Sequence, residues 1–395
     1  MATLQTRILG IDFENPFLLA SAPPTALVES IDIAFEMGWG GAVLKTITPD
    51  DLEMIEASPR YTTLSAKGQI IGFQNIELLS HQTVQYWCDG IKFLKEKHPT
   101  KVIIASIMAP VDKAQWQQLV KTLNNTAADA FELNFSCPHG MPEKGIGMAI
   151  GTDAQISAQI TGWVKEVAQK PVFVKLSPNV SNIAEIALAV QKAGADGLAA
   201  INTVQGFMGI DLDTMRPNLD IDGKTTFGGC SGPIVKPIGL RCVAQIRQAS
   251  ELPILGMGGI STWEDAVQYI AVGSDALQVC TEVMLNGYSV IRALKKGLLS
   301  YLESKALADI NALKDNAARQ ITAHEALNKK YRVRPQIDAQ KCARCGKCAA
   351  ICGQSEAGAL KLTPQVKVDE EKCKGCGLCK WVCPAQAITL KPCAQ

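Results

Sequence analysis

The sequence predicts a (β/α)8 TIM barrel followed by a small α+β domain. Eight short apolar runs, each followed by a stretch of helical character, repeat through the first 300 residues. The last part of the chain instead carries eight cysteines in two runs of identical spacing. A chain of 395 residues is also longer than one hydrophobic core usually holds. We assign residues 1–305 to the barrel, 306–335 to a helical linker and 336–395 to a ferredoxin-like domain.

The eight apolar runs have the character of buried parallel strands. They are Phe17–Ser21, Gly41–Thr46, Val102–Ile107, Ala130–Ser136, Val172–Ser177, Gly197–Asn202, Pro253–Gly259 and Asp275–Thr281. Continuous apolar runs that alternate with helices indicate a parallel sheet covered on both faces. Residues 182–193 illustrate the helices, with apolar side chains at Ile183, Ile186 and Val190. The alternative, an open doubly wound sheet, predicts a glycine-rich loop after its first strand, and none stands there.

A linker is predicted between the barrel and the C-terminal cysteines. Residues 301–330 lack glycine and proline and are rich in Ala, Leu and Lys, which favours a helix. We place the boundary of the last domain at Arg334-Pro335.

The cysteines near the C-terminus form two C-x2-C-x2-C-x3-C runs. This is the spacing of two-cluster bacterial ferredoxins, in which the fourth Cys of each run binds the other cluster. One 4Fe–4S cluster is therefore assigned to Cys342, Cys345, Cys348 and Cys383, and the other to Cys373, Cys376, Cys379 and Cys352. Zinc sites usually take their ligands as separated pairs, and a disulfide framework needs an oxidising compartment. The spacing thus favours one-electron transfer.

The bulk composition is that of an ordinary globular protein. Hydrophobic residues make up 47% and the net charge is +1, so there is no electrostatic case for binding nucleic acid or a membrane surface. The N-terminus has no apolar signal core, and no run approaches the roughly 18 apolar residues of a spanning helix. Thiolate clusters without an export signal favour the cytoplasm.

Polar residues gather at the predicted carboxyl ends of the barrel strands, where barrel active sites lie. Two lysines and several amides there favour a polar cofactor, and the Gly258-Gly259 pair after the seventh strand suits a phosphate. A phosphate site combined with one-electron clusters indicates FMN, which accepts electrons singly and passes on a hydride; Lys175 would stabilise negative charge on the flavin. We expect cofactor contacts from Ser21, Lys45, Thr46, Asn134, Lys175, Asn202, Gly232, Gly258, Gly259, Cys280 and Thr281. As thiols, Cys88, Cys230, Cys242 and Cys280 are predicted to be inert.

Four segments in order resemble the dihydropyrimidine dehydrogenases, in particular the pyrimidine-reducing subunit of the bacterial two-subunit enzymes. They are Asn75-Ile76-Glu77-Leu78, Asn134-Phe135-Ser136-Cys137-Pro138-His139-Gly140, Lys175-Leu176-Ser177-Pro178-Asn179 and Ile201-Asn202-Thr203-Val204. The resemblance covers nearly the whole chain. It implies a reversible reduction of uracil or thymine, with hydride from FMN to C6 and a proton to C5. It also implies a partner subunit that carries FAD and binds NAD(P)H, plausibly in a heterotetramer.

The resemblance further implies the roles of individual residues. Cys137 matches the family's acid, and a thiol with a pKa near 8.5 is protonated at neutral pH and can donate. The substrate contacts that the resemblance implies are Asn75, Glu77, Asn134, Asn202 and Thr203. A side-chain amide can donate a hydrogen bond to the acceptors of a pyrimidine edge and accept one from its donors. His139 matches the family too, with its role left open.

Two other interpretations compete with this one. A dihydroorotate dehydrogenase has the same barrel, flavin and often the same acid, but it commonly has Asn where this chain has His139, and a fused two-cluster domain is foreign to it. The second alternative is an electron-transfer subunit whose barrel is not catalytic. Turnover of orotate without uracil would favour the first, and FMN binding without pyrimidine turnover would favour the second.

Overall fold

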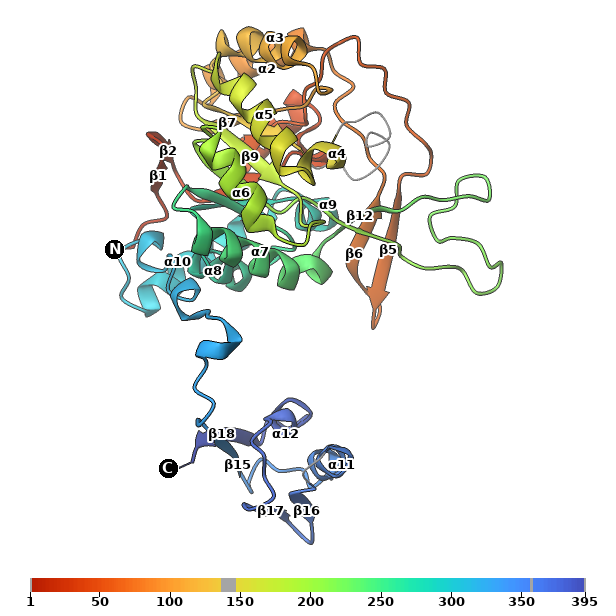
Figure 1. Ribbon diagram of the computed structural model, residues 1–395, viewed down its shortest axis with the longest axis vertical. Coiled ribbons are helices and arrows are strands. Elements are labelled where there is room, and N and C mark those ends of the chain that lie inside the picture. The colour runs from red at the N-terminus through yellow and green to blue at the C-terminus, as the bar shows by residue number, and fades with distance from the viewer. Residues whose placement is uncertain (1, 136–146, 356–357, 394–395) are drawn as a thin grey trace. The chain divides into compact units, whose positions relative to one another are not determined.

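The computed structural model describes residues 2–135, 147–355 and 358–393. They form two compact units, Met1–Ile321 and Thr322–Gln395 (Figure 1). Among the helices of the described residues, none is long and apolar enough to cross a membrane.

The first unit is a closed barrel of eight parallel strands, as predicted. Around the barrel the strands follow the order β10-β13-β14-β3-β4-β7-β8-β9. Their bounds are β3 Phe17–Leu19, β4 Gly41–Val43, β7 Val102–Ile107, β8 Ala130–Asn134, β9 Val172–Leu176, β10 Gly197–Ala200, β13 Ile254–Met257 and β14 Ala276–Val279. Each strand lies within its predicted apolar run, and the polar residue at the end of most runs lies just beyond the strand.

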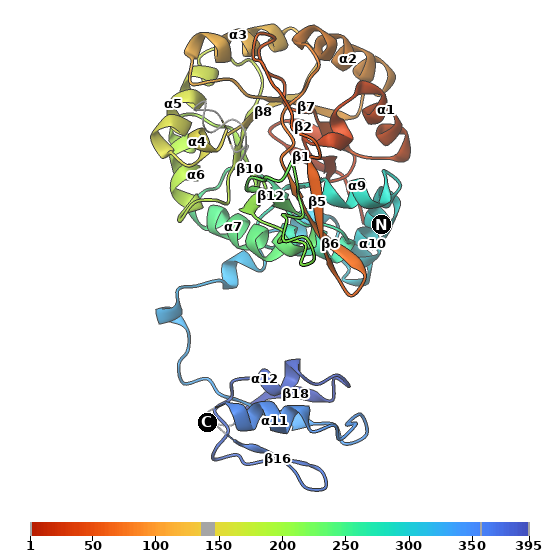
Figure 2. The same ribbon diagram turned by 90° about the vertical axis from the view of Figure 1, so that its right-hand side faces the viewer.

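Helices surround the barrel, as Figure 2 shows. They are α1 Val28–Met37, α2 Val84–Lys97, α3 Lys113–Asn124, α4 Met148–Gly151, α5 Ala154–Lys165, α6 Ile183–Lys192, α7 Lys236–Ala249, α8 Trp263–Ala271, α9 Thr281–Asn286 and α10 Val290–Ser304. The helix predicted over 182–193 is confirmed as α6. Its buried residues, Ile183, Ile186, Ala187 and Val190, recur at the period of a helix face.

The barrel packs in two layers because its strands have two apolar faces. Outward residues such as Phe131 and Val174 pack against the helices in the larger cluster. Inward residues such as Leu18, Ile104 and Phe173 fill the barrel interior. Towards the carboxyl ends the inward positions become polar, so the floor of the site is built on a packed core.

An antiparallel sheet of four strands, in the order β11-β12-β6-β5, is added to the barrel. Its strands are β5 Tyr61–Ala66, β6 Gln69–Asn75, β11 Val204–Gly206 and β12 Gly228–Ser231. Strands β5, β6 and β12 lie at one side of the barrel in Figure 1. A separate hairpin, β1 Thr6–Ile8 and β2 Ile11–Phe13, stands near the N-terminus. Neither of these sheets was predicted from the sequence.

The prediction of a helical linker over 306–335 is wrong. After α10 the chain makes three short 3-10 turns, Ile310–Ala312, Ala318–Gln320 and His324–Ala326, and β15 begins at Val333. The first two turns belong to the barrel unit, which extends to Ile321 rather than 305. Ile310, Leu313 and Ala318 are buried there, and the Asp309 side chain accepts hydrogen bonds from two backbone N–H groups. Burial of these few apolar residues and local capping replace the helix that composition favoured.

The second unit is a small α+β domain. It contains β15 Val333–Ile337, α11 Lys347–Gln354, β16 Leu360–Leu362, β17 Val366–Val368, α12 Leu378–Trp381 and β18 Ile388–Pro392. Strand β15 pairs with β18 and β16 with β17, both antiparallel. Its buried core consists of Cys348, Leu360, Cys379 and Ile388.

Candidate active site

One pocket opens at the carboxyl ends of the barrel strands. Its empty volume is about 1080 Å³, open mouth included. It gathers every predicted substrate and cofactor residue that the structure describes: Ser21, Lys45, Thr46, Asn75, Glu77, Asn134, Lys175, Asn202, Thr203, Gly232, Gly258, Gly259, Cys280 and Thr281. Cys137 and His139 lie outside the described residues.

Three glycines form a narrow part of this pocket. Gly232, Gly258 and Gly259 have φ values of +89°, +121° and +73°, a region that side-chain-bearing residues rarely adopt. A Cβ at Gly259 would lie 2.6 Å from the Gly232 carbonyl oxygen and 3.0 Å from the Lys236 nitrogen. Gly232 directly precedes the turn that leads into α7, and Thr281 begins α9. A phosphate binds to backbone N–H groups at the start of a helix, and glycines let it approach these groups closely.

A hydroxyl and amide cluster forms the floor. The Thr46 hydroxyl is its centre, 2.9 Å from Ser106 Oγ, 3.1 Å from Ser21 Oγ and 2.9 Å from the Asn134 amide nitrogen. The Asn202 amide nitrogen donates in turn to the Asn134 carbonyl oxygen at 3.3 Å. These residues come from five strand ends, so only closure of the barrel brings them together.

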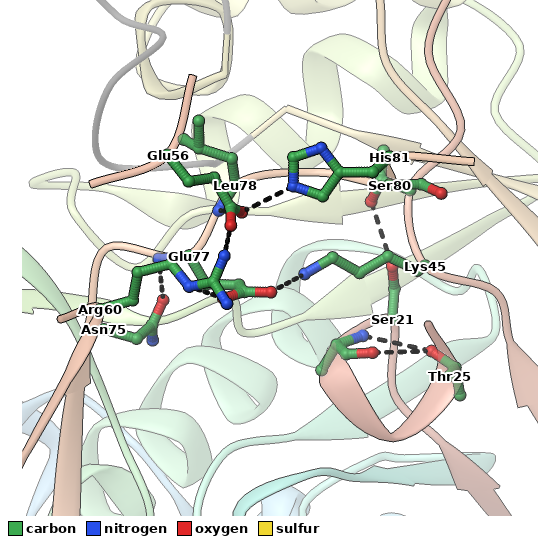
Figure 3. A network of polar contacts seen from close by, with 12 residues as sticks. Ser21, Thr25, Lys45, Glu56, Arg60, Asn75, Glu77, Leu78, Ser80 and His81 are labelled. Carbon is green, nitrogen blue, oxygen red and sulfur yellow. Dashed lines mark hydrogen bonds and ion pairs between the residues drawn. The ribbon is translucent and has the colours of Figure 1, made fainter. Parts of the chain in front are cut away.

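A chain of charged residues begins in the pocket wall with Lys45 and Glu77 and continues away from the pocket (Figure 3). Lys45 Nζ lies 3.0 Å from Glu77 Oε1, and Arg60 Nε lies 3.2 Å from Glu77 Oε2. Arg60 also pairs with Glu56, whose other oxygen lies 3.3 Å from His81 Nε2 and accepts the Leu78 backbone N–H at 3.2 Å. The buried end of this chain is Lys45, and its exposed end is His81.

The charge chain keeps Glu77 ionised. Burial raises the pKa of this carboxyl, but Lys45, the Tyr61 hydroxyl and Arg60 outweigh burial, so the pKa lies below its usual value. For Tyr61, burial and the neighbouring Glu77 raise the pKa, so its hydroxyl stays protonated. Glu77 therefore presents a hydrogen-bond acceptor at neutral pH.

The thiols predicted to be inert lie in environments that disfavour the thiolate. Burial raises the pKa of Cys280 to about 11, against the opposing influence of Lys175 and Lys45. Burial also raises the pKa values of Cys88, Cys230 and Cys242. Cys230 and Cys280 nevertheless line the pocket, so they shape it without being ionised.

Several residues of the pocket were not predicted from the sequence. Tyr61 and Phe73 come from the unpredicted antiparallel sheet, and Gln278 from the middle of β14. Glu132, beneath the pocket, is fully buried within β8. Both Glu132 and Gln278 interrupt runs expected to be buried on both faces, which is the signal that could have marked them.

In the second unit, two pockets each gather four cysteines. One is lined by Cys342, Cys345, Cys348 and Cys383, and the other by Cys352, Cys373, Cys376 and Cys379, as the spacing predicts. Among the described residues, no three or more Cys, His, Asp or Glu converge as ligands of a single metal ion. Ligands of a cubane are instead spread over the corners of the cluster. The fourth Cys of each run accepts a backbone N–H, Ala359 to Cys352 at 3.2 Å and Ala387 to Cys383 at 3.3 Å, and such bonds suit a cluster thiolate.

Comparison with known families identifies both units. The profile of the dihydroorotate dehydrogenase family matches residues 3–302, and a 4Fe–4S dicluster domain matches residues 335–390. The chain belongs to the dihydroorotate dehydrogenase family. It is an oxidoreductase whose cofactors are FMN in the barrel and two 4Fe–4S clusters in the dicluster domain. The glycine cradle and the two sets of four thiols fit these groups.

Relatives within this family fall into two kinds. The chain is 36% identical to a chloroplastic NADP-dependent dihydropyrimidine dehydrogenase of Arabidopsis thaliana, over 83% of this chain and 80% of the relative. It is 36% identical to the PreA subunit of the NAD-dependent dihydropyrimidine dehydrogenase of Escherichia coli K12, over 88% of this chain and 85% of the relative. It is 38% identical to the catalytic subunit of a dihydroorotate dehydrogenase B of Pyrococcus abyssi, over 78% of this chain and 97% of the relative.

The extent of these matches distinguishes the two kinds. The barrel unit contains 321 of the 395 residues, or 81% of the chain. A match over 88% of the chain must therefore extend into the dicluster unit, whereas one over 78% need not.

Proposed function

We propose that this chain catalyses the reversible reduction of the C5=C6 bond of uracil or thymine, with electrons supplied by a partner subunit that binds FAD and NAD(P)H. The observation that carries the proposal is that three side-chain amides and an ionised carboxylate line the same pocket. Asn75, Asn134 and Asn202 line it together with Thr203 and Glu77. The names of the two dihydropyrimidine dehydrogenase relatives support the same substrate class.

The charge pattern of the pocket favours a neutral substrate. Lys45 pairs with Glu77 at 3.0 Å and Lys175 with Glu132 at 3.7 Å, so both lysines have carboxylate partners within the chain. A pyrimidine offers ring N–H groups that a carboxylate can accept and carbonyl oxygens that amide N–H groups can reach. The carboxylate of orotate would instead be repelled by Glu77.

Each part of the chain has its own task. When bound, FMN supplies a hydride and the 4Fe–4S clusters supply electrons one at a time. Asn75, Asn202 and Thr203 orient the pyrimidine ring, and Glu77 accepts one of its N–H groups. The Cys137 thiol donates the proton that C5 requires. The glycines at 232, 258 and 259 hold the phosphate of the flavin, with Thr281 at the start of α9.

We assign the oxidation of NAD(P)H to a partner. The sequence contains no Gly-rich loop between a strand and a helix of the kind that holds a dinucleotide. The E. coli relative, by its name, is a subunit of an NAD-dependent enzyme. Thiolate clusters further favour a reducing compartment such as the cytoplasm.

A substrate survey tests the proposal. The anaerobically purified chain, supplied with a low-potential one-electron donor, should reduce uracil or thymine and leave orotate unchanged. It should not oxidise NADH or NADPH by itself at a useful rate. Turnover of orotate but not uracil would reverse the assignment in favour of the activity named for the Pyrococcus relative, and flavin binding without turnover of either would support the non-catalytic alternative.

The acid is tested separately. Cys137→Ala should keep FMN and iron but lose turnover by about 10²–10⁴-fold, the usual value of general acid catalysis. Cys137→Ser should retain slight activity, because a hydroxyl is a poorer acid. If Cys137→Ala stays within about threefold of the parent, general acid catalysis comes from another residue, and His139 is the next to test.

A further inference from the structure

Glu132 is a carboxylate inside the barrel that the proposed reaction does not use. Its side chain is 0% exposed, in the middle of strand β8. A carboxylate removed from water is costly unless it is paired and hydrogen-bonded. Its two polar neighbours are Lys175 Nζ, 3.7 Å from Oε1, and Gln278 Nε2, 2.6 Å from Oε2.

These three residues share the inward face of the barrel strands. Ala130, Phe173 and Ala276 belong to the interior cluster, and strand residues two positions apart share a face. Glu132, Lys175 and Gln278 each lie two residues further along β8, β9 and β14, so they also face the interior. The register pairs Glu132 with Phe173 and Lys175 with Asn134, so Glu132 lies deeper in the barrel than Lys175. Lys175 and Gln278 line the pocket, whereas Glu132 lies behind them.

The carboxylate also determines how the Gln278 amide is oriented. The Gln278 amide nitrogen donates to Glu132 Oε2, so the nitrogen is the atom of the amide that faces Glu132. Gln278 Oε1 is then directed elsewhere, and it has no hydrogen-bond partner within the described part of the chain. A buried carbonyl oxygen beside a pocket is an acceptor suited to a ligand N–H group.

We infer that Glu132 is a positioning residue for the flavin: it offsets the charge of Lys175, orients Gln278 and thereby lowers the reduction potential of the bound FMN. The inference rests on the assignment of Lys175 to the flavin in the proposed function. A cation near the flavin favours the reduced form, which carries more negative charge, and a carboxylate beside that cation weakens the effect. The other pocket lysine, Lys45, is paired with Glu77 instead.

The test is the midpoint potential of the bound FMN, measured by spectroelectrochemistry on the complete chain. Glu132→Gln keeps the shape and an acceptor for Gln278 but removes the charge. It should favour reduced FMN at least tenfold, which corresponds to about 30 mV for a two-electron couple. Lys175→Met should shift the potential the opposite way, and the double variant should lie between the two single variants.

The matched control is Glu166→Gln, the same substitution at an exposed carboxylate that pairs with Lys113. It should leave the flavin potential unchanged. A shift in Glu132→Gln no larger than in Glu166→Gln would overturn the inference. If Lys175→Met still lowers the potential in that case, the flavin assignment of Lys175 stands; if it does not, that assignment fails as well. Neither outcome depends on which substrate the enzyme reduces.

A second measurement tests the inference even if Glu132→Gln folds poorly. Lys175→Met alone leaves a buried carboxylate without its cation, whereas the double variant leaves a neutral pair. The double variant should therefore unfold at a higher temperature and retain more FMN than Lys175→Met. Equal melting temperatures would contradict a counter-charge role for Glu132.

Discussion

The barrel pocket and the dicluster unit encode their sites in opposite ways. In the dicluster unit, the eight cysteines lie within 42 consecutive residues, 342–383, and their spacing alone predicts which four belong together. In the barrel, the pocket residues extend from Ala20 to Met284 and come from many strand ends and an added sheet. A cluster ligand is defined by its local sequence, whereas a pocket residue is defined by the closure of the whole fold.

The two units also differ in what their sites do for stability. The barrel has two large apolar layers, and most of their residues do not line its pocket. The hydrophobic cluster of the dicluster unit is small, and two of its buried members, Cys348 and Cys379, are predicted ligands. We therefore expect cofactor loss to unfold the dicluster unit but to leave the barrel folded.

The largest effect is expected for a ligand in the dicluster core. The parent chain should bind about eight iron ions and eight sulfides, four per cubane. Cys379→Ala should lose at least one cluster and, with it, hydrogen-exchange protection across the second unit, while FMN content stays unchanged. Cys393, which lines neither cysteine pocket, provides the control, and Cys393→Ser should keep full iron content. Unchanged iron content in Cys379→Ala would contradict this assignment of ligands.

An intermediate effect is expected for Arg60, which lies behind the pocket wall and pairs with Glu77 (Figure 3). Arg60→Met should raise KM for the pyrimidine roughly tenfold, about 1.4 kcal/mol of binding, with iron and FMN unchanged. Glu77 has a depressed pKa, so its interaction is present at neutral pH and is lost as the pH falls through that pKa. Without Arg60 the pKa moves back towards 4.5, so binding should weaken at a higher pH than in the parent.

Two further variants serve as controls for the effect of Arg60→Met on KM. Arg60→Lys should recover part of the affinity, because it restores the charge without the planar guanidinium. Arg7→Met removes an exposed arginine that pairs with Asp12 at 3.4 Å on the N-terminal hairpin, and it should change neither KM nor its pH profile. Equal pH profiles for Arg60→Met and the parent would show that Arg60 does not hold the Glu77 carboxylate.

The smallest effect is expected at Gly259, which can be compared with Gly287 because the two glycines have nearly the same φ angle. Gly259 and Gly287 have φ values of +73° and +76°, but only at Gly259 would a Cβ meet other atoms within 4 Å. Gly287→Ala should cost about 1–2 kcal/mol of stability for the left-handed conformation alone. Gly259→Ala should add to this a loss of FMN affinity, measured by fluorescence titration of the flavin-free chain. Equal flavin affinity in the two variants would remove Gly259 from the phosphate cradle.

The sequence alone was sufficient to predict the barrel, the grouping of the cysteines and most of the residues that line the pocket. Apolar runs alternating with helices predict strands buried on both faces, and polar residues at the run ends predict where the site forms. The described pocket contains all fourteen of the predicted substrate and cofactor residues listed above. The strands and the grouping of the cysteines could be predicted because they depend on local periodicity and spacing, whereas the substrate residues were predicted from the resemblance to a family.

The tertiary structure decided what local patterns do not contain. Composition favoured a helix over 301–330, but after α10 burial of a few apolar side chains and local capping produced 3-10 turns instead. The pairing of Glu77 with Arg60 depends on an antiparallel sheet that sequence periodicity did not reveal. The burial of Glu132 beside Lys175 and Gln278 depends on three strands meeting in the barrel interior. Electrostatic energies depend on distance and burial, and both are properties of the closed barrel rather than of any one segment.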